Sequence, residues 1–394
     1  MNPFDISKFP GSLHPTISEL SKETEFTAYS DRGGNGYVLF GENKVLKRPI
    51  VLKIYFWDNG DHAEPEMLAK LEHENILQVY HAAAIDDDYA YFATRFCPDG
   101  DLDHLIAKGP IAILRAIDIV MQISAGVSFL HGNNYLHRDL KPLNIFCDTG
   151  KFVVGDFGSV VQCDENGYAR TLTRHSLLYR PPETVEGNDY YKQGDVYQLG
   201  ILLYQLLGGW LPYEETQWLN EKQHQKYLAL SGFDQQKFAT DIITGKIRAG
   251  TLLNTPGLPP FVPTGLRTII RRATNRSKEK RHASVADLAG ALNNLKGSIP
   301  DWQFPGGVPT LHRENKSVRI LQQGSSFLLQ KKASAEWRNV GGSHAKSVGC
   351  RHQSNGTLTS GVQARGTEAV GNWSGRTARH PPGHHLRFRY SYNF

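Results

Sequence analysis

One stretch of the sequence, HRDLKPLN at residues 137–144, carries three side chains that together could transfer a charged group. The carboxylate of Asp139 lies two residues before Lys141 and five residues before Asn144. An aspartate can accept a hydrogen bond from an attacking hydroxyl, a lysine can neutralise a phosphoryl group in transfer, and an asparagine carbonyl can ligate Mg²⁺. A polar loop that ends a helix, with Pro142 as the stop, is the structural alternative.

A second carboxylate follows at the end of an apolar, strand-like run. Asp156 lies twelve residues after Asn144 and is followed by Phe157 and Gly158. A carboxylate in this place could hold a metal ion against phosphate oxygens. Because two such signals occur in this order, we interpret them as parts of one phosphate-handling site.

Two features nearer the N-terminus could contact the same phosphates. Lys53 lies within the apolar run IVLK, so we expect either a phosphate or carboxylate partner or a side chain that extends to the surface. The stretch SDRGGNGYV places Gly33, Gly34 and Gly36 between two strand-like runs, where their backbone N–H groups could approach phosphates. By itself this glycine pattern favours an ordinary hairpin turn.

Hydrophobic periodicity places these residues in two kinds of element. β-Prone runs lie at residues 26–30, 37–40, 50–55, 76–80 and 89–94, with a short helical stretch at 66–71. Beyond residue 102 the spacing becomes helical, most clearly at 114–131 and 196–207. The sequence therefore predicts a small β-rich lobe followed by a large helical lobe.

In this order the motifs resemble those of the protein kinase family, in its bacterial or eukaryotic-like serine/threonine form, over roughly residues 26–296. The resemblance implies an α+β, bilobal protein kinase fold and a reaction that uses ATP with Mg²⁺ or Mn²⁺. It implies that Lys53 holds the α- and β-phosphates, that Asp139 is the catalytic base and that Lys141 contacts the γ-phosphate. Asn144 and Asp156 resemble the two metal-binding residues.

The resemblance also assigns residues around the nucleotide. Glu64 is the best match for the glutamate that pairs with Lys53, and Glu66 is the second choice. Pro65 indicates a short helix that begins close to Glu64. Asp31 stands where the family has its first loop glycine. The positions that resemble ATP-binding residues of the glycine-rich loop, the hinge and the adenine pocket are Gly33, Gly34, Gly36, Val38, Val51, Thr94, Phe96, Cys97, Asp101 and Phe146.

Other residues resemble structural and regulatory positions of the family. Glu183, at the end of the activation segment, resembles the partner of Arg281, and Asp195 resembles the buried aspartate that braces the catalytic loop. Ser176 resembles the hydroxyl that orients the catalytic aspartate and lysine. Unmodified threonines in the activation segment are an equal alternative to autophosphorylation, for which the candidate sites are Thr171 and Thr173.

These assignments predict an ATP-dependent protein kinase that phosphorylates serine and threonine hydroxyl groups of proteins, including its own. Lys141 favours this specificity over tyrosine or dual specificity, which stay open. A small-molecule phosphotransferase would share the base and the metal-binding residues but is disfavoured by Glu183 and Arg281. A pseudokinase scaffold is disfavoured because the catalytic lysine and both catalytic carboxylates are present.

The composition limits the class of protein and its compartment. A content of 40% hydrophobic and 21% charged residues excludes wholly disordered, collagen-like and coiled-coil chains. The four cysteines are too few and too scattered for a disulfide framework, and the first residues do not resemble a secretory signal. The longest apolar run, residues 196–213, contains Gln198 and Gln205 and is better interpreted as a buried helix than as a membrane span. We therefore expect a soluble, cytoplasmic protein without membrane contact.

The net charge of +5 is unevenly distributed. Residues 1–299 carry a net charge of −4 and residues 300–394 carry +9, and the composition becomes rich in glycine and serine at the same point. The predicted divisions are an N-terminal extension at 1–25, a kinase domain at 26–297 with lobes at 26–94 and 95–297, and a basic, poorly ordered tail at 298–394.

The basic tail has two interpretations. Its arginines and interspersed aromatic residues could bind nucleic acid or an acidic partner. Because these residues are spread out rather than clustered, we favour a flexible extension without a specific role and do not otherwise expect a nucleic-acid partner. Within the tail, residues 318–330 could form one hairpin that docks on the helical lobe.

Overall fold

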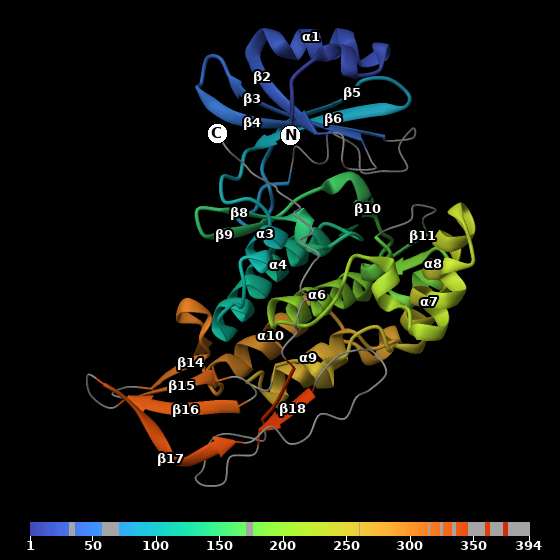
Figure 1. Cartoon of the computed structure of the whole chain (residues 1–394). Coiled ribbons are helices and arrows are strands. Elements are labelled where there is room, and N and C mark those ends of the chain that lie inside the picture. The colour runs from blue at the N-terminus through green and yellow to red at the C-terminus, as the bar shows by residue number, and fades with distance from the viewer. Residues whose placement is uncertain are drawn as a thin grey trace.

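The computed structural model describes residues 1–30, 36–56, 71–170, 176–259, 261–313, 316–323, 326–332, 336–345, 359–362 and 373–376. Several predicted residues of the glycine-rich loop, the helix after it and the activation segment lie outside the described residues: Gly33, Gly34, Glu64, Glu66, Thr171 and Thr173. Within the described part, a small lobe built on a sheet lies above a large helical lobe (Figure 1). This arrangement confirms the predicted bilobal fold.

The small lobe is an antiparallel sheet with one helix across its outer face (Figure 1). The strands, in the spatial order β1-β2-β3-β4-β6-β5, are β1 (Asn2–Pro3), β2 (Thr24–Ser30), β3 (Gly36–Asn43), β4 (Arg48–Phe56), β5 (Val79–Ala84) and β6 (Tyr89–Arg95). The covering segment consists of the short 3₁₀ turns η1 (Ile6–Lys8) and η2 (Gly11–Leu13) and the helix α1 (His14–Glu23). The sequence predicted β2, β3, β4 and β6 but neither β1 nor α1, and the strand expected at 76–80 shares only its last two residues with β5.

Successive residues of these strands alternate between the two faces of the sheet. On β4, Leu52 and Ile54 are buried in the apolar cluster beneath α1. Lys53, between them, is in register with Val38 on β3 and Phe92 on β6. The sheet therefore turns its lysine away from α1 and toward the large lobe.

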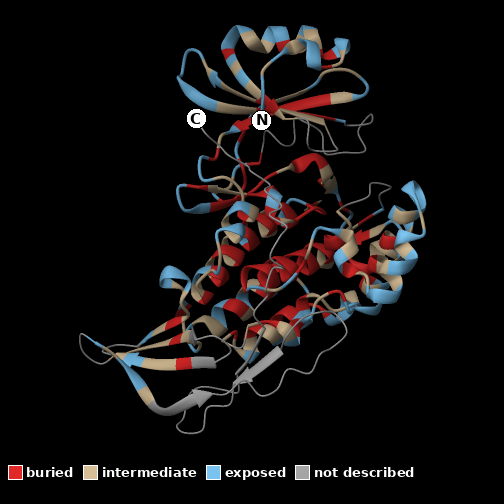
Figure 2. Cartoon of the chain, in the orientation of Figure 1, coloured by how far each residue is buried: buried red, intermediate tan, exposed pale blue. Residues whose placement is uncertain are grey.

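The large lobe is built around two buried helices. Its helices are α3 (Leu102–Ala107), α4 (Ile113–Gly132), α5 (Pro182–Glu186), α6 (Lys192–Leu206), α7 (Glu221–Leu228), α8 (Gly232–Ala249), α9 (Thr264–Ala273) and α10 (Val285–Lys296). Its short strands are β7 (Tyr135–Leu136), β8 (Ile145–Asp148), β9 (Lys151–Val154), β10 (Val161–Gln162), β11 (Tyr168–Arg170) and β12 (Asp189–Tyr191). Figure 2 shows the buried residues concentrated along α4 and α6.

Short 3₁₀ turns connect these elements: η4 (Pro142–Asn144), η5 (Phe157–Ser159), η6 (Leu177–Tyr179), η7 (Glu215–Trp218), η8 (Thr255–Gly257), η9 (Lys278–Lys280) and η10 (Pro305–Gly307). Helix α6 is buried from Gly194 to Leu206, as predicted for the first part of the apolar run at 196–213. The helix ends at Leu206, however, and Trp210 and Tyr213 beyond it are exposed. Among the described residues, α4 alone is long and apolar enough to cross a membrane, and 56% of its most apolar window is buried inside the lobe.

Part of the basic tail is regular. A five-stranded antiparallel sheet consists of β13 (Trp302–Gln303), β14 (Thr310–Arg313), β15 (Lys316–Gln323), β16 (Ser326–Lys332) and β17 (Trp337–Ala345), and a separate pair consists of β18 (Thr359–Val362) and β19 (Trp373–Arg376). The hairpin β15–β16 matches the one that we predicted at 318–330. Ile320 and Trp302 join the large-lobe core, so this hairpin docks on the helical lobe as expected.

Candidate active site

The loop between β7 and β8 brings the three side chains of the HRDLKPLN stretch together. Lys141 Nζ donates a hydrogen bond to Asp139 Oδ2 at 2.7 Å and another to Ser176 Oγ at 2.9 Å. Asn144 Nδ2 donates to the backbone carbonyl of Asp139 at 2.7 Å and to Oδ2 of the same residue at 3.0 Å. The carboxylate is therefore oriented by a cation and an amide, and a hydroxyl group of the activation segment lies beside it.

The second carboxylate faces the small lobe. Asp156 follows β9, and its Oδ1 accepts a hydrogen bond from Lys53 Nζ on β4. Its backbone is left-handed, with φ of 56° and ψ of 73°, a conformation that is uncommon for a residue other than glycine and that concentrates at functional sites. The structure thus joins two residues that are 103 positions apart in the chain.

Opposing effects act on the ionisation of Asp156. Burial raises the pKa of this carboxyl group, but the ion pair with Lys53, helped by the positive charge of Lys141, outweighs burial and holds the pKa below its ordinary value. Asp156 is therefore a stable carboxylate at neutral pH, which is the form that a metal ion requires.

The residues present fit a magnesium ion that is shared with a nucleotide. The backbone N–H of Gly155 donates to the carbonyl of Asn144 at 2.9 Å, which ties the asparagine to the residue before Asp156. One carboxylate and one amide oxygen match the hard oxygen ligands that Mg²⁺ prefers. Within the described part of the chain, no group of three or more His, Cys, Asp or Glu side chains could hold a metal ion.

The glycine-rich loop is described only at its downstream edge. Gly36 begins β3 with φ of +128°, and a Cβ atom there would lie 2.0 Å from the backbone oxygen of Ile54. Only glycine fits this close approach of β3 to β4. Val38 follows two residues later, opposite Lys53 in the register.

The predicted hinge residues follow β6 where the two lobes join. Thr94, near the end of β6, is 3% exposed and lies opposite Val51 of β4. Phe96 and Cys97 come next, and burial raises the pKa of the Cys97 thiol to about 12, so this cysteine stays protonated. The prediction that these residues contact adenine remains a prediction.

Asp101 and Phe146, also predicted at the nucleotide, form an isolated antiparallel bridge. The Asp101 carboxylate caps α3 by accepting from the backbone N–H of His104 at 2.8 Å, and burial raises its pKa. A side chain at Gly155 would lie within 2.8 Å of the Phe146 ring. The ring can therefore lie against the chain just before Asp156 only because residue 155 is glycine.

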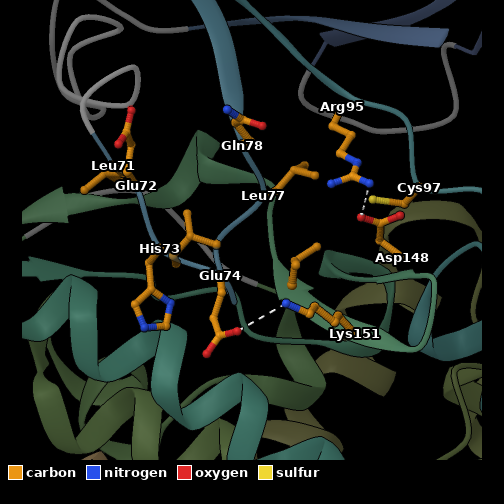
Figure 3. Close-up of a pocket in the computed structure, with 12 residues that line it drawn as sticks. Leu71, Glu72, His73, Glu74, Leu77, Gln78, Arg95, Cys97, Asp148 and Lys151 are labelled. Carbon is orange, nitrogen blue, oxygen red and sulfur yellow. Dashed lines mark hydrogen bonds and ion pairs between the residues drawn. The ribbon is translucent and has the colours of Figure 1, made fainter. Parts of the chain in front are cut away.

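A cavity of about 330 Å³ is lined by residues just before β5, at the end of β6 and on β8 and β9 (Figure 3). The ion pairs Arg95–Asp148, at 3.0 Å, and Lys151–Glu74, at 3.2 Å, cross its lining. Cys97 lines it, but no residue of the predicted catalytic set does. The cavity is therefore distinct from the phosphate-handling site.

Asp195, at the start of α6, lies beneath the catalytic loop and is fully buried. Its carboxylate accepts hydrogen bonds from the backbone N–H groups of His137, at 3.0 Å, and Arg138, at 2.9 Å. His131 Nε2, at 2.7 Å, and the Tyr190 hydroxyl, at 2.9 Å, complete its surroundings. Burial raises the pKa of Asp195, but these hydrogen bonds and the nearby histidines outweigh burial and lower the pKa below its ordinary value. The Asp195 carboxyl group is therefore ionised.

The end of the activation segment is fixed by a two-point ion pair. Arg281 NH1 and NH2 donate to Glu183 Oε1 and Oε2 at 2.8 and 2.6 Å. The guanidinium group also donates to the backbone carbonyls of Asn275 and Gln193. The structure thus brings together the Glu183–Arg281 pair that the resemblance implied.

Gln198 is a site residue that our sequence analysis did not assign. It is fully buried on α6, one turn after Asp195. Its Oε1 accepts from the backbone N–H of Leu140 at 2.8 Å, and its Nε2 donates to the carbonyls of Arg138 at 2.7 Å and Tyr179 at 3.2 Å. A polar amide inside an otherwise apolar helix, three residues after the bracing aspartate, was the signal that could have identified it.

Comparison with known proteins identifies the matching family over most of the chain. The family described as protein kinase domain matches residues 32–285. The serine/threonine-protein kinase PrkC of Bacillus subtilis is 31% identical over 303 residues, which cover 72% of this chain and 43% of that protein. The probable serine/threonine-protein kinase PknB of Lactococcus lactis is 27% identical over 269 residues, covering 65% of this chain and 39% of that protein.

A eukaryotic relative gives a similar result. The Aurora kinase of Schizosaccharomyces pombe is 29% identical over 220 residues, which cover 55% of this chain and 54% of that protein. The chain thus spans less than half the length of the two bacterial relatives and about half that of the yeast protein.

Proposed function

Because the chain belongs to the protein kinase family, we propose that it transfers the γ-phosphoryl group of ATP to serine and threonine hydroxyl groups of proteins. The observation that carries this proposal is the pairing of two clusters across the lobes. Asp139, Lys141 and Asn144 form one cluster, and the Lys53–Asp156 ion pair forms the other. Together they supply a base, positive charge and oxygen ligands, which are the groups that phosphoryl transfer needs.

The chemistry assigns one role to each group. Asp139 accepts the proton of the attacking hydroxyl as the new oxygen–phosphorus bond forms, and the bond between the γ-phosphorus and the bridging oxygen breaks to release ADP. Lys141, which donates to Asp139 Oδ2, provides positive charge near the transferred group. Asn144 and Asp156 would hold Mg²⁺ or Mn²⁺, which neutralises the phosphate oxygens when bound.

The preference for serine and threonine is the finer part of the proposal. Lys141 bridges the catalytic carboxylate and the Ser176 hydroxyl, so a cation is fixed at the place where a hydroxyl acceptor would approach. Two bacterial relatives carry the name serine/threonine-protein kinase, which supports the same preference. Tyrosine or dual specificity is the alternative within the same reaction.

Two other functions are less well supported. A scaffold without turnover would not need the complete set of oriented catalytic groups that this chain has. A small-molecule phosphotransferase would not need the Glu183–Arg281 ion pair at the end of a protein-binding segment. We keep both as outcomes of the test.

The test is transfer of label from γ-labelled ATP, with Mg²⁺ and with or without a generic protein substrate. Lys53→Ala and Asp139→Asn should remove transfer, whereas Lys151→Ala, which loses only an exposed ion pair with Glu74, should retain it. Acid hydrolysis of the product should release phosphoserine and phosphothreonine. Nucleotide binding without transfer would favour the scaffold, and label found only on small acceptors would favour the phosphotransferase.

Self-phosphorylation at Thr171 or Thr173 is part of the same proposal and rests on the sequence alone. Arg138 is fully buried and donates its Nε to the carbonyl of Ser159, so its positive charge lies against the segment that carries both threonines. Phosphopeptide mapping of the active enzyme should find phosphate on one of the two threonines. An unmodified segment in fully active enzyme would contradict this part.

A further inference from the structure

The first residues of the chain form a cover on the outer face of the small lobe, which we call the N-terminal cover and define as residues 2–23. The family match begins only at residue 32, so it does not include this segment. Strand β1 extends the sheet by pairing with β2, and the backbone N–H of Phe4 donates to the carbonyl of Thr27 at 3.1 Å. Helix α1 then lies across the strands (Figure 1).

The cover is held to the sheet by burial of apolar side chains. From the cover, Phe9 is 5% exposed, and Leu13 and Ile17 are fully buried. The sheet residues in the same cluster are Tyr29, Leu39, Leu52, Ile54, Tyr91 and Ala93. Removal of this much apolar surface from water makes the cover an integral part of the small lobe.

Phe9 occupies a particular place in this cluster, between the two strands that enter and leave the glycine-rich loop. Its ring centroid lies 5.2 Å from that of Tyr29, near the end of β2, and 5.1 Å from that of Tyr37, at the start of β3. The ring meets Tyr37 edge-to-face, with an interplanar angle of 62°, and is tilted by 60° against Tyr29. One ring therefore contacts both stems of the loop.

The backbone around Phe9 is fixed as well. Its N–H donates to the carbonyl of Ile6 at 3.2 Å, and its carbonyl lies 3.0 Å from His14 Nε2. On its other side the ring packs against Phe4, which in turn packs against Phe26 of β2. The ring is thus held between the cover and the sheet and cannot move without disturbing either.

Because successive side chains of a strand point to opposite faces of the sheet, residues under the cover alternate with residues that face the expected nucleotide site. Tyr37 and Leu39 point to the cover, while Val38 between them is one of the residues expected above the adenine. On β4, Leu52 and Ile54 lie under the cover, and Lys53 between them faces Asp156. The outer cluster therefore sets the position of the side chains on the inner face.

We infer that Phe9 is a positioning residue for ATP: by contacting Tyr29 and Tyr37 it fixes the spacing of the two stems of the glycine-rich loop from outside. The N-terminal cover is then part of the nucleotide site, although no residue of the cover touches the nucleotide. This inference rests on the proposed function for its ligand, ATP, and concerns the affinity for ATP rather than the rate of transfer.

The experiment compares Phe9→Leu with Ile17→Ala, which removes buried apolar surface from the same cover without changing the ring contacts. Phe9→Leu should weaken ATP binding, measured as the Kd of the full chain for a fluorescent ATP analogue, about fivefold. Turnover at saturating ATP should stay unchanged. Ile17→Ala should lower the melting temperature at least as much but leave the Kd within about twofold.

A double-mutant cycle and a second readout keep the inference falsifiable. The effects of Phe9→Leu and Tyr37→Leu on the Kd should be less than additive, because the two rings share one contact. Phe9→Leu should also speed amide hydrogen exchange in residues 27–30 and 36–40 more than Ile17→Ala does. An unchanged Kd with a lowered melting temperature, or fully additive effects, would overturn the inference.

Failure of the proposed function is distinguishable from failure of this inference. A wild-type chain that binds no ATP would contradict the proposed function. In that case the exchange measurement decides alone whether Phe9 holds the loop stems: selective acceleration in Phe9→Leu supports the role, and equal exchange in both variants overturns it.

Discussion

Gln198 forms hydrogen bonds with the backbone on both sides of Asp139. Its Oε1 accepts from the N–H of the residue after the carboxylate, Leu140, and its Nε2 donates to the carbonyl of the residue before it, Arg138. The same Nε2 reaches the carbonyl of Tyr179, next to the end of the activation segment. One buried amide thus fixes the backbone on both sides of Asp139, the proposed base, and links it to the end of the activation segment.

Gln198→Glu should reduce turnover about tenfold or more with little change in ATP affinity, because a carboxylate cannot donate to the two carbonyls and repels them. Steady-state kinetics with varied ATP and varied peptide would separate the two effects. The matched control is Gln205→Glu, since Gln205 accepts a hydrogen bond from the Tyr179 hydroxyl and a carboxylate would accept it too. Equal loss of activity in both variants would contradict a specific role for Gln198.

The Lys53–Asp156 ion pair should make stability depend on pH. In the wild type the pKa of Asp156 is lowered, so its contribution to stability is present above the ordinary aspartate value and is lost as the pH falls through the lower folded value. In Lys53→Met the cation is gone, and burial raises the pKa of the same group. The free energy of unfolding of the variant, relative to wild type, should therefore fall by about 1 kcal/mol from acidic to neutral pH.

Urea denaturation at a series of pH values measures this difference. Lys151→Met, which breaks an exposed ion pair with Glu74, serves as the control and should show a nearly constant difference from wild type. A Lys53→Met curve parallel to wild type at every pH would mean that Asp156 does not depend on Lys53 for its ionisation.

Arg281→Met should destabilise the chain by about 3 kcal/mol, because it leaves the Glu183 carboxylate partly buried without its partner. The double variant Arg281→Met with Glu183→Gln should recover part of this loss, since no uncompensated charge remains. Thermal melting of the wild type and of these two variants tests both statements. A double variant less stable than Arg281→Met would show that the charge of Glu183 has another partner.

Ser176→Ala should lower turnover about threefold to tenfold. Lys141 is oriented by hydrogen bonds to both Asp139 and the Ser176 hydroxyl, and the variant removes the second of these acceptors. Ser176→Thr keeps the hydroxyl and should retain most of the activity. Steady-state kinetics of the two variants gives the answer, and equal activity of both would show that the hydroxyl does not orient the lysine.

The grouping of the three proposed catalytic residues could be predicted because they belong to one short motif. Asp139, Lys141 and Asn144 lie within six residues, and the loop that holds them brings them into mutual hydrogen bonds. The pairing of Lys53 with Asp156 was not predicted. The family resemblance gave Lys53 a glutamate partner and assigned Asp156 to the metal ion, and nothing in the local sequence links two residues that are 103 positions apart.

Other parts of the structure had no comparable signal. The hydrogen-bond partners of Gln198 are backbone N–H and carbonyl groups. Because nearly every residue carries these groups, the partners could not be inferred from the sequence. The N-terminal cover was predicted only as an extension. Its aromatic residue Phe9 packs against Tyr29 and Tyr37 of the sheet, and the sequence alone does not show that these rings meet. In the tail, β13 spans two residues and is too short for alternation to be recognised. The nine-residue strand β17 was also not predicted, and the hairpin β15–β16 was the one that the sequence indicated.

The tail also supplies a hydrogen-bond acceptor for the first turn of helix α4 in the large lobe. The first turn of α4 has no side-chain cap of its own, and the backbone N–H of Leu114 donates instead to Asp301 Oδ1, at 3.0 Å, from beyond the predicted end of the kinase domain. Trp302 follows at once and is buried against the large lobe. A fragment ended at residue 297 would lose the carboxylate and expose the apolar patch together. The two regions should accordingly melt in a single calorimetric transition, as one cooperative unit.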